Sequence, residues 1–107
     1  MPATKPKRVL LVTYDLKDEV DSERARLFFE MLKTKGQWMH YIDSTWFIAT
    51  IDSPVEMRTA IEPFKDIVQR FLVMEASQHY SGWMPREAWE WLRKQFIEIT
   101  TGRLPGM

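Results

Sequence analysis

A chain of 107 residues has the size of one domain, which a single hydrophobic core can stabilise. Its 15 basic and 15 acidic residues cancel, which argues against a broad electropositive surface of the kind that binds duplex nucleic acid non-specifically. Cysteine is absent, and this excludes disulfide bonds, zinc thiolate sites and thiol catalysis.

The composition and the lack of long apolar runs also bear on where the protein works. Hydrophobic residues make up 45% of the chain and charged residues 28%, which is typical of a folded globular protein. No apolar run approaches the length of a membrane span, and no signal peptide precedes the first predicted strand. We therefore expect a cytoplasmic protein without a membrane partner.

The first two predicted elements are a strand and a helix. Residues 8–15 are rich in valine and leucine and form too short a run for a helix, so we expect a strand. Residues 17–36 predict a helix: Asp21 or Ser22 can cap its start, and Gly36 can adopt the left-handed conformation at its end. Its apolar residues recur at the spacing i, i+3, i+4 and i+7, which places them on one face of the helix. They are Ala25, Phe28, Phe29 and Leu32.

A hairpin and a second helix are expected next. Residues 38–51 contain two aromatic and β-branched segments on either side of Asp43 and Ser44, which predicts two strands joined by a tight turn. The helix after them has two start signals. Ser53 and Glu56 have the spacing of a capping box, and a proline falls in the first helical turn.

The last third of the chain predicts one more strand and one more helix. Pro63 should kink the second helix or end it early. Residues 70–76 then form the fourth expected strand, and residues 85–100 form a third helix. Residues 1–7 and 101–107 are expected to be loose tails.

The element order βαββαβ, followed by a helix, predicts an α+β fold in one domain of residues 1–107. Right-handed crossovers after the first and third strands favour an antiparallel sheet in the order 4-1-3-2, which is the ferredoxin-like arrangement. Two helices should cover one face of this sheet. The third helix or a partner chain should cover the other face, because an open apolar face would be an association surface.

Two aspartates are expected at the same end of this sheet. Asp15 ends the first strand and Asp43 ends the second, about 10 Å apart at two strand spacings. Ser44 and Arg70 should lie beside them, where a hydroxyl and a guanidinium group suit phosphate. Oxygen ligands suit Mg²⁺, which takes one or two protein carboxylates and keeps several waters. The alternative is that both aspartates only form turns, because aspartate is favoured where strands end.

Four segments of the chain are similar to known proteins. VTYDL at residues 12–16, GQWMHYIDST at 36–45 and SPVE at 53–56 resemble the CRISPR-associated endoribonucleases of the spacer-integration machinery and the related virulence-associated protein D toxins. Together with YSGWMPREAWEWLRK at 80–94, they resemble SinR-like small proteins over nearly the whole chain. The resemblance implies a ferredoxin-like fold.

The resemblance also implies a homodimer that cleaves phosphodiester bonds with a divalent metal ion. In that family the aspartate that ends the first strand of each protomer faces its mate, and Asp15 matches this catalytic aspartate. On this interpretation Asp15 and Asp43 bind Mg²⁺, which lowers the pKa of a bound water. The expected contacts to an RNA or DNA substrate come from Tyr14, Ser44 and Arg70.

The tryptophan-rich end of the chain departs from that family, which usually ends in an extra strand that crosses to the partner. Trp83, Trp89 and Trp91 lie within nine residues, and tryptophan is enriched at protein interfaces. The chain is also neutral, whereas the family is often basic. The second hypothesis is therefore a non-catalytic dimeric adaptor that binds a protein partner through these tryptophans.

Overall fold

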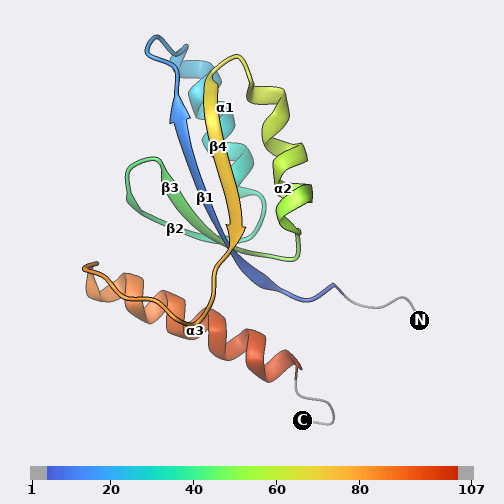
Figure 1. Ribbon diagram of the computed structural model, residues 1–107, viewed down its shortest axis with the longest axis vertical. Coiled ribbons are helices and arrows are strands. Elements are labelled where there is room, and N and C mark those ends of the chain that lie inside the picture. The colour runs from blue at the N-terminus through green and yellow to red at the C-terminus, as the bar shows by residue number, and fades with distance from the viewer. Residues whose placement is uncertain (1–4, 104–107) are drawn as a thin grey trace.

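The computed structural model describes residues 5–103, with side chains to residue 101, and its elements follow the expected order (Figure 1). Residues 1–4 and 104–107 of the two expected tails lie outside this range. The last helix continues to Arg103, so residues 101–103 are helical rather than part of a tail. The elements are β1 (Arg8–Leu16), α1 (Ser22–Lys33), β2 (Gln37–Ile42), β3 (Thr45–Thr50), α2 (Pro54–Ile61), the 3₁₀ turn η1 (Glu62–Phe64), β4 (Val68–Glu75) and α3 (Arg86–Arg103).

A four-stranded antiparallel sheet organises the fold. Its strand order is β2-β3-β1-β4, so β1 is hydrogen bonded to β3 on one side and to β4 on the other. At the middle of β1, Val12 lies opposite Trp46 of β3 and Val73 of β4. The α+β class expected from the sequence is confirmed. No helix within residues 5–103 is long and apolar enough to cross a bilayer.

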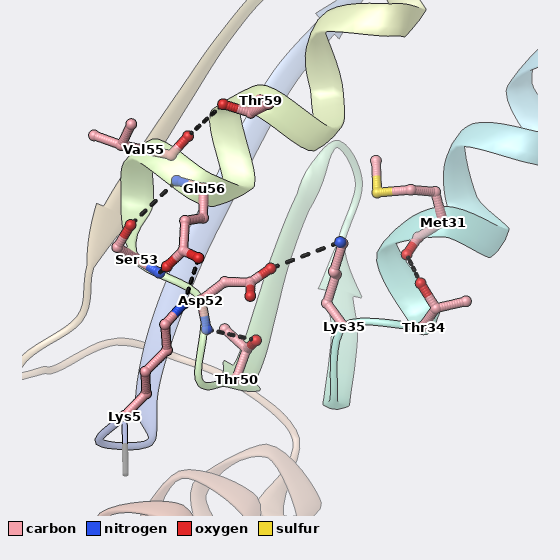
Figure 2. A network of polar contacts seen from close by, with 10 residues as sticks. All are labelled: Lys5, Met31, Thr34, Lys35, Thr50, Asp52, Ser53, Val55, Glu56 and Thr59. Atoms are coloured by element: carbon pink, nitrogen blue, oxygen red, sulfur yellow. Dashed lines mark hydrogen bonds and ion pairs between the residues drawn. The ribbon is translucent and has the colours of Figure 1, made fainter. Parts of the chain in front are cut away.

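Helix α2 begins at the predicted capping box. The Ser53 hydroxyl accepts a hydrogen bond from the Glu56 backbone N–H at 3.1 Å, and the Glu56 carboxylate accepts one from the Ser53 N–H at 3.0 Å (Figure 2). These contacts satisfy N–H groups that have no partner within the first helical turn. The helix ends at Ile61, and Pro63 falls in the 3₁₀ turn, as expected for a residue that cannot continue a helix.

Helix α1 is capped as predicted but ends differently. The carboxylate of Asp21 accepts a hydrogen bond from the Glu23 N–H at 2.8 Å. At the other end the cap is Thr34 in the right-handed conformation, and Gly36 follows two residues later with φ +156°. A Cβ atom at Gly36 would lie 1.9 Å from the carbonyl oxygen of Ala49. Glycine is therefore required because β2 starts against the backbone of β3, and not because it caps the helix.

Helices α1 and α2 cover one face of the sheet and enclose the main core. Alternate residues of β1 point into it, and Leu10, Val12 and Tyr14 are at most 5% exposed. From the predicted stripe of α1, Phe28 and Leu32 are fully buried. The buried members are Leu10, Val12, Tyr14, Phe28, Leu32, Trp46, Ile48, Met57, Ile61, Phe64, Ile67 and Val68.

Helix α3 packs on the opposite face and forms a second core. It crosses the sheet at the end where β1 begins and β4 finishes (Figure 1). This position agrees with the expectation that the third helix covers the face that α1 and α2 leave free. The buried members of the second core are Val9, Met39, Ala88, Leu92, Phe96 and Ile99.

The cover provided by α3 stops part of the way along β1. On this face Val9 is buried, Leu11 and Thr13 are half-buried, and Asp15 is exposed. The neighbouring side chains of β4, Leu72 and Met74, lie opposite Thr13 and Leu11 and are each 51% exposed. We call this region, defined by these last residues of β1 and their partners on β4, the open half-face. Its members are Leu11, Thr13, Asp15, Arg70, Leu72 and Met74.

Candidate functional site at the open end of β1

Asp15 stands on the open half-face because of the period of the strand. Successive residues of a strand point to opposite faces, so the burial of Tyr14 under the helices turns Asp15 to the other side. The register between β1 and β4 shifts after Asp15, which leaves this residue at the last regular pair, opposite Arg70. The strand therefore presents an exposed carboxylate at its end.

Tyr14 lies next to Asp15 in the chain but on the other face. Its ring packs edge-on against Phe28, with centroids 5.0 Å apart at 86°, and its hydroxyl accepts a hydrogen bond from Trp46 Nε1 at 2.9 Å. Burial raises the pKa of Tyr14 above its usual value, although the Trp46 hydrogen bond opposes this change. The Tyr14 ring therefore contributes to the main core. Its contact with substrate stays a prediction.

Arg70 is the nearest charged neighbour of Asp15. Its Nε donates a hydrogen bond to Asp15 Oδ2 at 3.1 Å, and the two side chains are 74% and 60% exposed. An ion pair this exposed adds little to stability. The structure gives the terminal nitrogens of Arg70 no hydrogen-bond partner among residues 5–101. They are free to bind an anion that approaches Asp15 from solvent.

A shallow depression of about 380 Å³ surrounds this pair. Thr13 lines it, and its hydroxyl oxygen lies 3.2 Å from that of Thr45 on the neighbouring strand. Ser44 reaches the same place because its carbonyl oxygen accepts a hydrogen bond from the Tyr14 N–H at 3.1 Å. The Ser44 hydroxyl, however, donates to the carbonyl oxygen of Asp43 at 2.6 Å, so it is occupied by its own turn. The residues that line the depression are Thr13, Tyr14, Asp15, Ser44, Arg70, Phe71 and Leu72.

Asp43 belongs to the hairpin turn but does not line this depression. Its negative charge acts instead on Tyr14 and His40. It adds to the rise that burial causes in the pKa of Tyr14, and it opposes the larger effect of burial, which lowers the pKa of His40. The left-handed conformation of Ser44, with φ +57°, shapes the turn that carries Asp43. The structure thus brings Asp15, Ser44 and Arg70 together, and it leaves Asp43 beside groups that face the main core.

The donor set at this site is compatible with a hard cation but is small. Within residues 5–103 no group of three or more His, Asp or Glu side chains gathers where a metal ion could be held. Asp15 supplies one exposed carboxylate, and Thr13 and Ser44 add oxygen atoms to the same depression. Mg²⁺ suits such a site, because it takes one or two carboxylates and keeps several waters. The metal-binding roles of Asp15 and Asp43 stay predictions.

A second polar cluster lies at the opposite end of β1 and has a structural explanation. Lys5 contacts Glu56, and this contact, with the Ser53 N–H, lowers the pKa of Glu56 to about 2. Lys35 lies 3.7 Å from Asp52 in the same cluster (Figure 2). These charges cap α2 and pair with each other, so the cluster serves the helix start rather than a ligand.

The three tryptophans have different surroundings. Trp83 is 100% exposed, whereas Trp89 and Trp91 are half-buried against the second core. Tyr80 stacks on Trp89, with ring centroids 5.7 Å apart and planes 9° from parallel. Of the predicted partner-binding tryptophans, Trp83 is therefore the one whose ring is wholly available.

Sequence reasoning missed two contributors to these surfaces. Thr13 lies two residues before Asp15, so the strand period was a signal that it shares the face of Asp15. Tyr80 precedes α3 in a segment without helical or strand pattern, and no sequence signal indicated its stacking on Trp89.

Comparison with protein-family models, curated proteins and solved structures finds no match to this chain.

Proposed function

We propose that this protein is a homodimeric nucleic-acid-processing protein with a ferredoxin-like fold, in which two Asp15 carboxylates meet where the open half-faces of two copies join. The strand order supports the fold, because β2-β3-β1-β4 read from the other edge is 4-1-3-2. The observation that carries the function is the exposed Asp15 beside Arg70, on a sheet face that α3 covers only in part.

Exposed apolar side chains support the dimer. Leu72 and Met74 each keep 51% of their surface in solvent, on the same face as Asp15. Contiguous apolar surface of this kind marks interaction sites on soluble proteins. A second copy provides a self-complementary cover, because a two-fold axis places the same patch on both sides of the contact. The two Asp15 side chains then lie on either side of that axis.

The same arrangement supports phosphodiester chemistry. One carboxylate per chain is a weak metal site, and two copies supply a pair of carboxylates at one place. A divalent ion bound there lowers the pKa of a water ligand and offsets the charge of a phosphate. Asp15 holds the ion, and the terminal nitrogens of Arg70 orient a phosphate oxygen by charge-assisted hydrogen bonds. Thr13 and Ser44 contribute polar groups to the floor of the depression.

The decisive experiment measures cleavage of labelled single-stranded RNA and duplex DNA with Mg²⁺, with Mn²⁺ and with EDTA. We expect metal-dependent cleavage that Asp15→Asn abolishes without moving the thermal midpoint, because the Asp15–Arg70 pair is exposed. Asp18→Asn is the matched control, since Asp18 is an exposed acid in the loop after β1. Cleavage that persists in Asp15→Asn would refute the nuclease, as would an inactive wild-type protein.

A second candidate function is a dimeric adaptor without catalytic activity that binds another protein through its tryptophan-rich end. The full exposure of Trp83 favours it. Under this hypothesis Trp83→Ala weakens binding of a purified partner, while Asp15→Asn leaves it unchanged. A partner that binds both variants with wild-type affinity would exclude the adaptor function at this surface.

A further inference from the structure

Residues 76–85 connect β4 to α3 and run along α3 to its first residue; we call this segment the strap (Figure 1). It has no regular secondary structure, yet contacts fix it in place. The His79 N–H donates to the Ser77 hydroxyl at 3.1 Å. Tyr80 stacks on Trp89 and also on Phe96, with ring centroids 6.2 Å apart in the second pair. The strap therefore holds a defined path over α3.

Trp83 projects from this anchored strap into solvent. It is 100% exposed, whereas the next most exposed large apolar residue of the described chain, Val55, is 66% exposed. Tryptophan is highly buried on average, so an indole without cover from its own chain is unusual. Any contact that covers the Trp83 indole therefore gains the free energy of burying a whole aromatic side chain.

A cavity of about 190 Å³ lies beside Trp83, between the strap, α3 and the sheet. Typical small-molecule pockets are roughly 300–1,000 Å³, so this cavity is too small for most cofactors. A dry cavity of roughly 150 Å³ holds one benzene molecule, so this one has room for one larger aromatic group such as an indole. Its walls are mostly apolar and aromatic, and come from Met39, Ile42, Phe47, Ala76, Ser77, Tyr80, Ser81, Gly82, Trp83, Met84, Trp89 and Leu92.

We propose that two copies of this chain exchange Trp83 side chains, and that the indole of each copy fills the cavity of the other. The chain carries both halves of the contact: a fully exposed indole and, next to it, a cavity with room for one aromatic side chain. A ring and a cavity on one patch are self-complementary across a two-fold axis, which is the commonest symmetry of protein dimers.

The area of this contact is small and fits a weak association of two copies. Two tryptophans bury roughly 150–250 Å² each, and the cavity walls that they cover add a similar amount. The sum is roughly 600–1,000 Å², which is the area of a weak, reversible contact. Tyr80, which is 45% exposed, and Ile42, which is 47% exposed, border the cavity and supply more apolar area.

This contact goes beyond the proposed function, because it is separate from the contact at Asp15. The depression around Asp15 and the cavity beside Trp83 share no lining residue. If the two copies associate only through Trp83, the protein is a dimer. If the open half-faces associate as well, two different two-fold contacts give a tetramer or a longer assembly. The two contacts can therefore be removed one at a time.

The test measures molar mass by sedimentation equilibrium from micromolar to millimolar concentration for the wild type, Trp83→Ala, Leu72→Glu and a control, Val55→Ala. Val55 matches Trp83 as a highly exposed apolar residue, but it lies on α2. We expect Trp83→Ala to weaken self-association by about thirtyfold or more, the loss typical of an interface hot spot. Val55→Ala should associate as the wild type does, and loss in Leu72→Glu alone would overturn the exchange while leaving the dimer at Asp15 intact.

A second readout reports where the indole lies. In protein labelled with 5-fluorotryptophan, the ¹⁹F signal missing from Trp83→Ala identifies Trp83, and its shift between H₂O and D₂O measures its exposure. We expect this shift to fall as concentration rises. We also expect 3-methylindole to bind Trp83→Ala, which keeps every wall of the cavity except Trp83 itself, and to dissociate the wild-type assembly. A Trp83 signal that stays solvent-exposed at every concentration would overturn the proposal, as would 3-methylindole binding to a wild type that never self-associates.

Discussion

The two faces of the sheet differ in how far their helices cover them. On one face α1 and α2 enclose twelve buried residues, and the core extends from Leu10 to Tyr14 along β1. On the other face α3 buries Val9 but leaves Asp15 in solvent. Both faces are built from the same strands, and they differ in their side chains and in how far the helices cover them. The polar and apolar groups that remain available for binding are those that α3 does not reach.

Neighbouring residues of β1 therefore have different roles, one in stability and the other in binding. Tyr14 and Asp15 are adjacent in the sequence, yet one is 5% exposed in the main core and the other belongs to an exposed ion pair. A substitution on the first face should therefore change stability. A substitution on the open half-face should change binding or association and leave stability nearly unchanged.

The largest expected effect is a loss of stability when the same substitution, leucine to alanine, is made in each of the two cores. Leu32 of α1 is 0% exposed and Leu92 of α3 is 4% exposed. We expect Leu32→Ala to lower the free energy of unfolding by about 4 kcal/mol and Leu92→Ala by about 2–3 kcal/mol, because the enclosed core relaxes less around a cavity. Urea denaturation of both variants measures this. An equal or larger loss for Leu92→Ala would mean that α3 holds its face as firmly as α1 holds the other.

A smaller effect tests which way the side chains of β4 point. Val73 lies opposite Val12 and packs against the main core, whereas Leu72 lies opposite Thr13 on the open half-face. We expect Val73→Asp to cost about 2 kcal/mol of stability, because it brings a charge to the main core. Leu72→Asp should change stability by less than about 0.5 kcal/mol. Thermal melts of the two variants measure these losses. A larger loss for Leu72→Asp than for Val73→Asp would show that the two faces of β4 are wrongly assigned.

A still smaller effect, of opposite sign, is expected under α3. Gln95 is 0% exposed, and its Nε2 donates to the side-chain oxygen of Gln37. Its own Oε1 has no hydrogen-bond partner in the described residues. Gln95→Met should stabilise the fold by about 1 kcal/mol, because a buried amide is removed and the exposed Gln37 turns to water. Denaturant midpoints measure the change. Gln37→Ala is the contrasting variant and should destabilise, because it leaves the buried Gln95 Nε2 without an acceptor. A destabilised Gln95→Met would show that the Gln95 amide stabilises the packing of α3.

The smallest expected effect is a pH dependence at the rim of the covered face. His40 stacks on Trp46, with ring centroids 4.4 Å apart, and burial lowers its pKa below the usual 6.5, against the opposing charge of Asp43. The unfolded chain therefore binds the proton more readily. The contribution of His40 to stability is complete above about pH 6.5 and declines as the pH falls toward the lower pKa of the folded state.

NMR titration of the imidazole and urea midpoints between pH 5 and 8 check this dependence. His40→Asn should flatten the pH profile of stability, since asparagine does not titrate. A pKa of His40 at or above its ordinary value would contradict the assignment.

The elements with local signals were predictable from the sequence. The capping box at Ser53, the turn at Asp43 and Ser44, and the helix end before Pro63 each depend on residues within a few positions of one another. The end of β1 was predictable as well, because the strand period places Asp15 on one face and the register then pairs it with Arg70.

Features that depend on distant parts of the chain were not predictable. The reason for glycine at position 36 is the carbonyl oxygen of Ala49, which belongs to another strand. The apolar pattern of α3 indicates which residues pack, but not how far along β1 the helix lies. Trp83 was grouped with Trp89 by spacing, yet the helix begins only at Arg86, so Trp83 falls in the strap and stays exposed.

The position of α3 has a consequence for the order of folding during synthesis. The buried members of the main core lie within residues 10–68, which precede α3 in the chain and therefore emerge from the ribosome before it. The second core joins Val9, near the start of β1, to Ile99, near the end of α3. A nascent chain that has emerged through β4 can close one face while Val9 and Met39 still lie in water. The last helix to be translated is thus also the one that removes the apolar surface most attractive to chaperones.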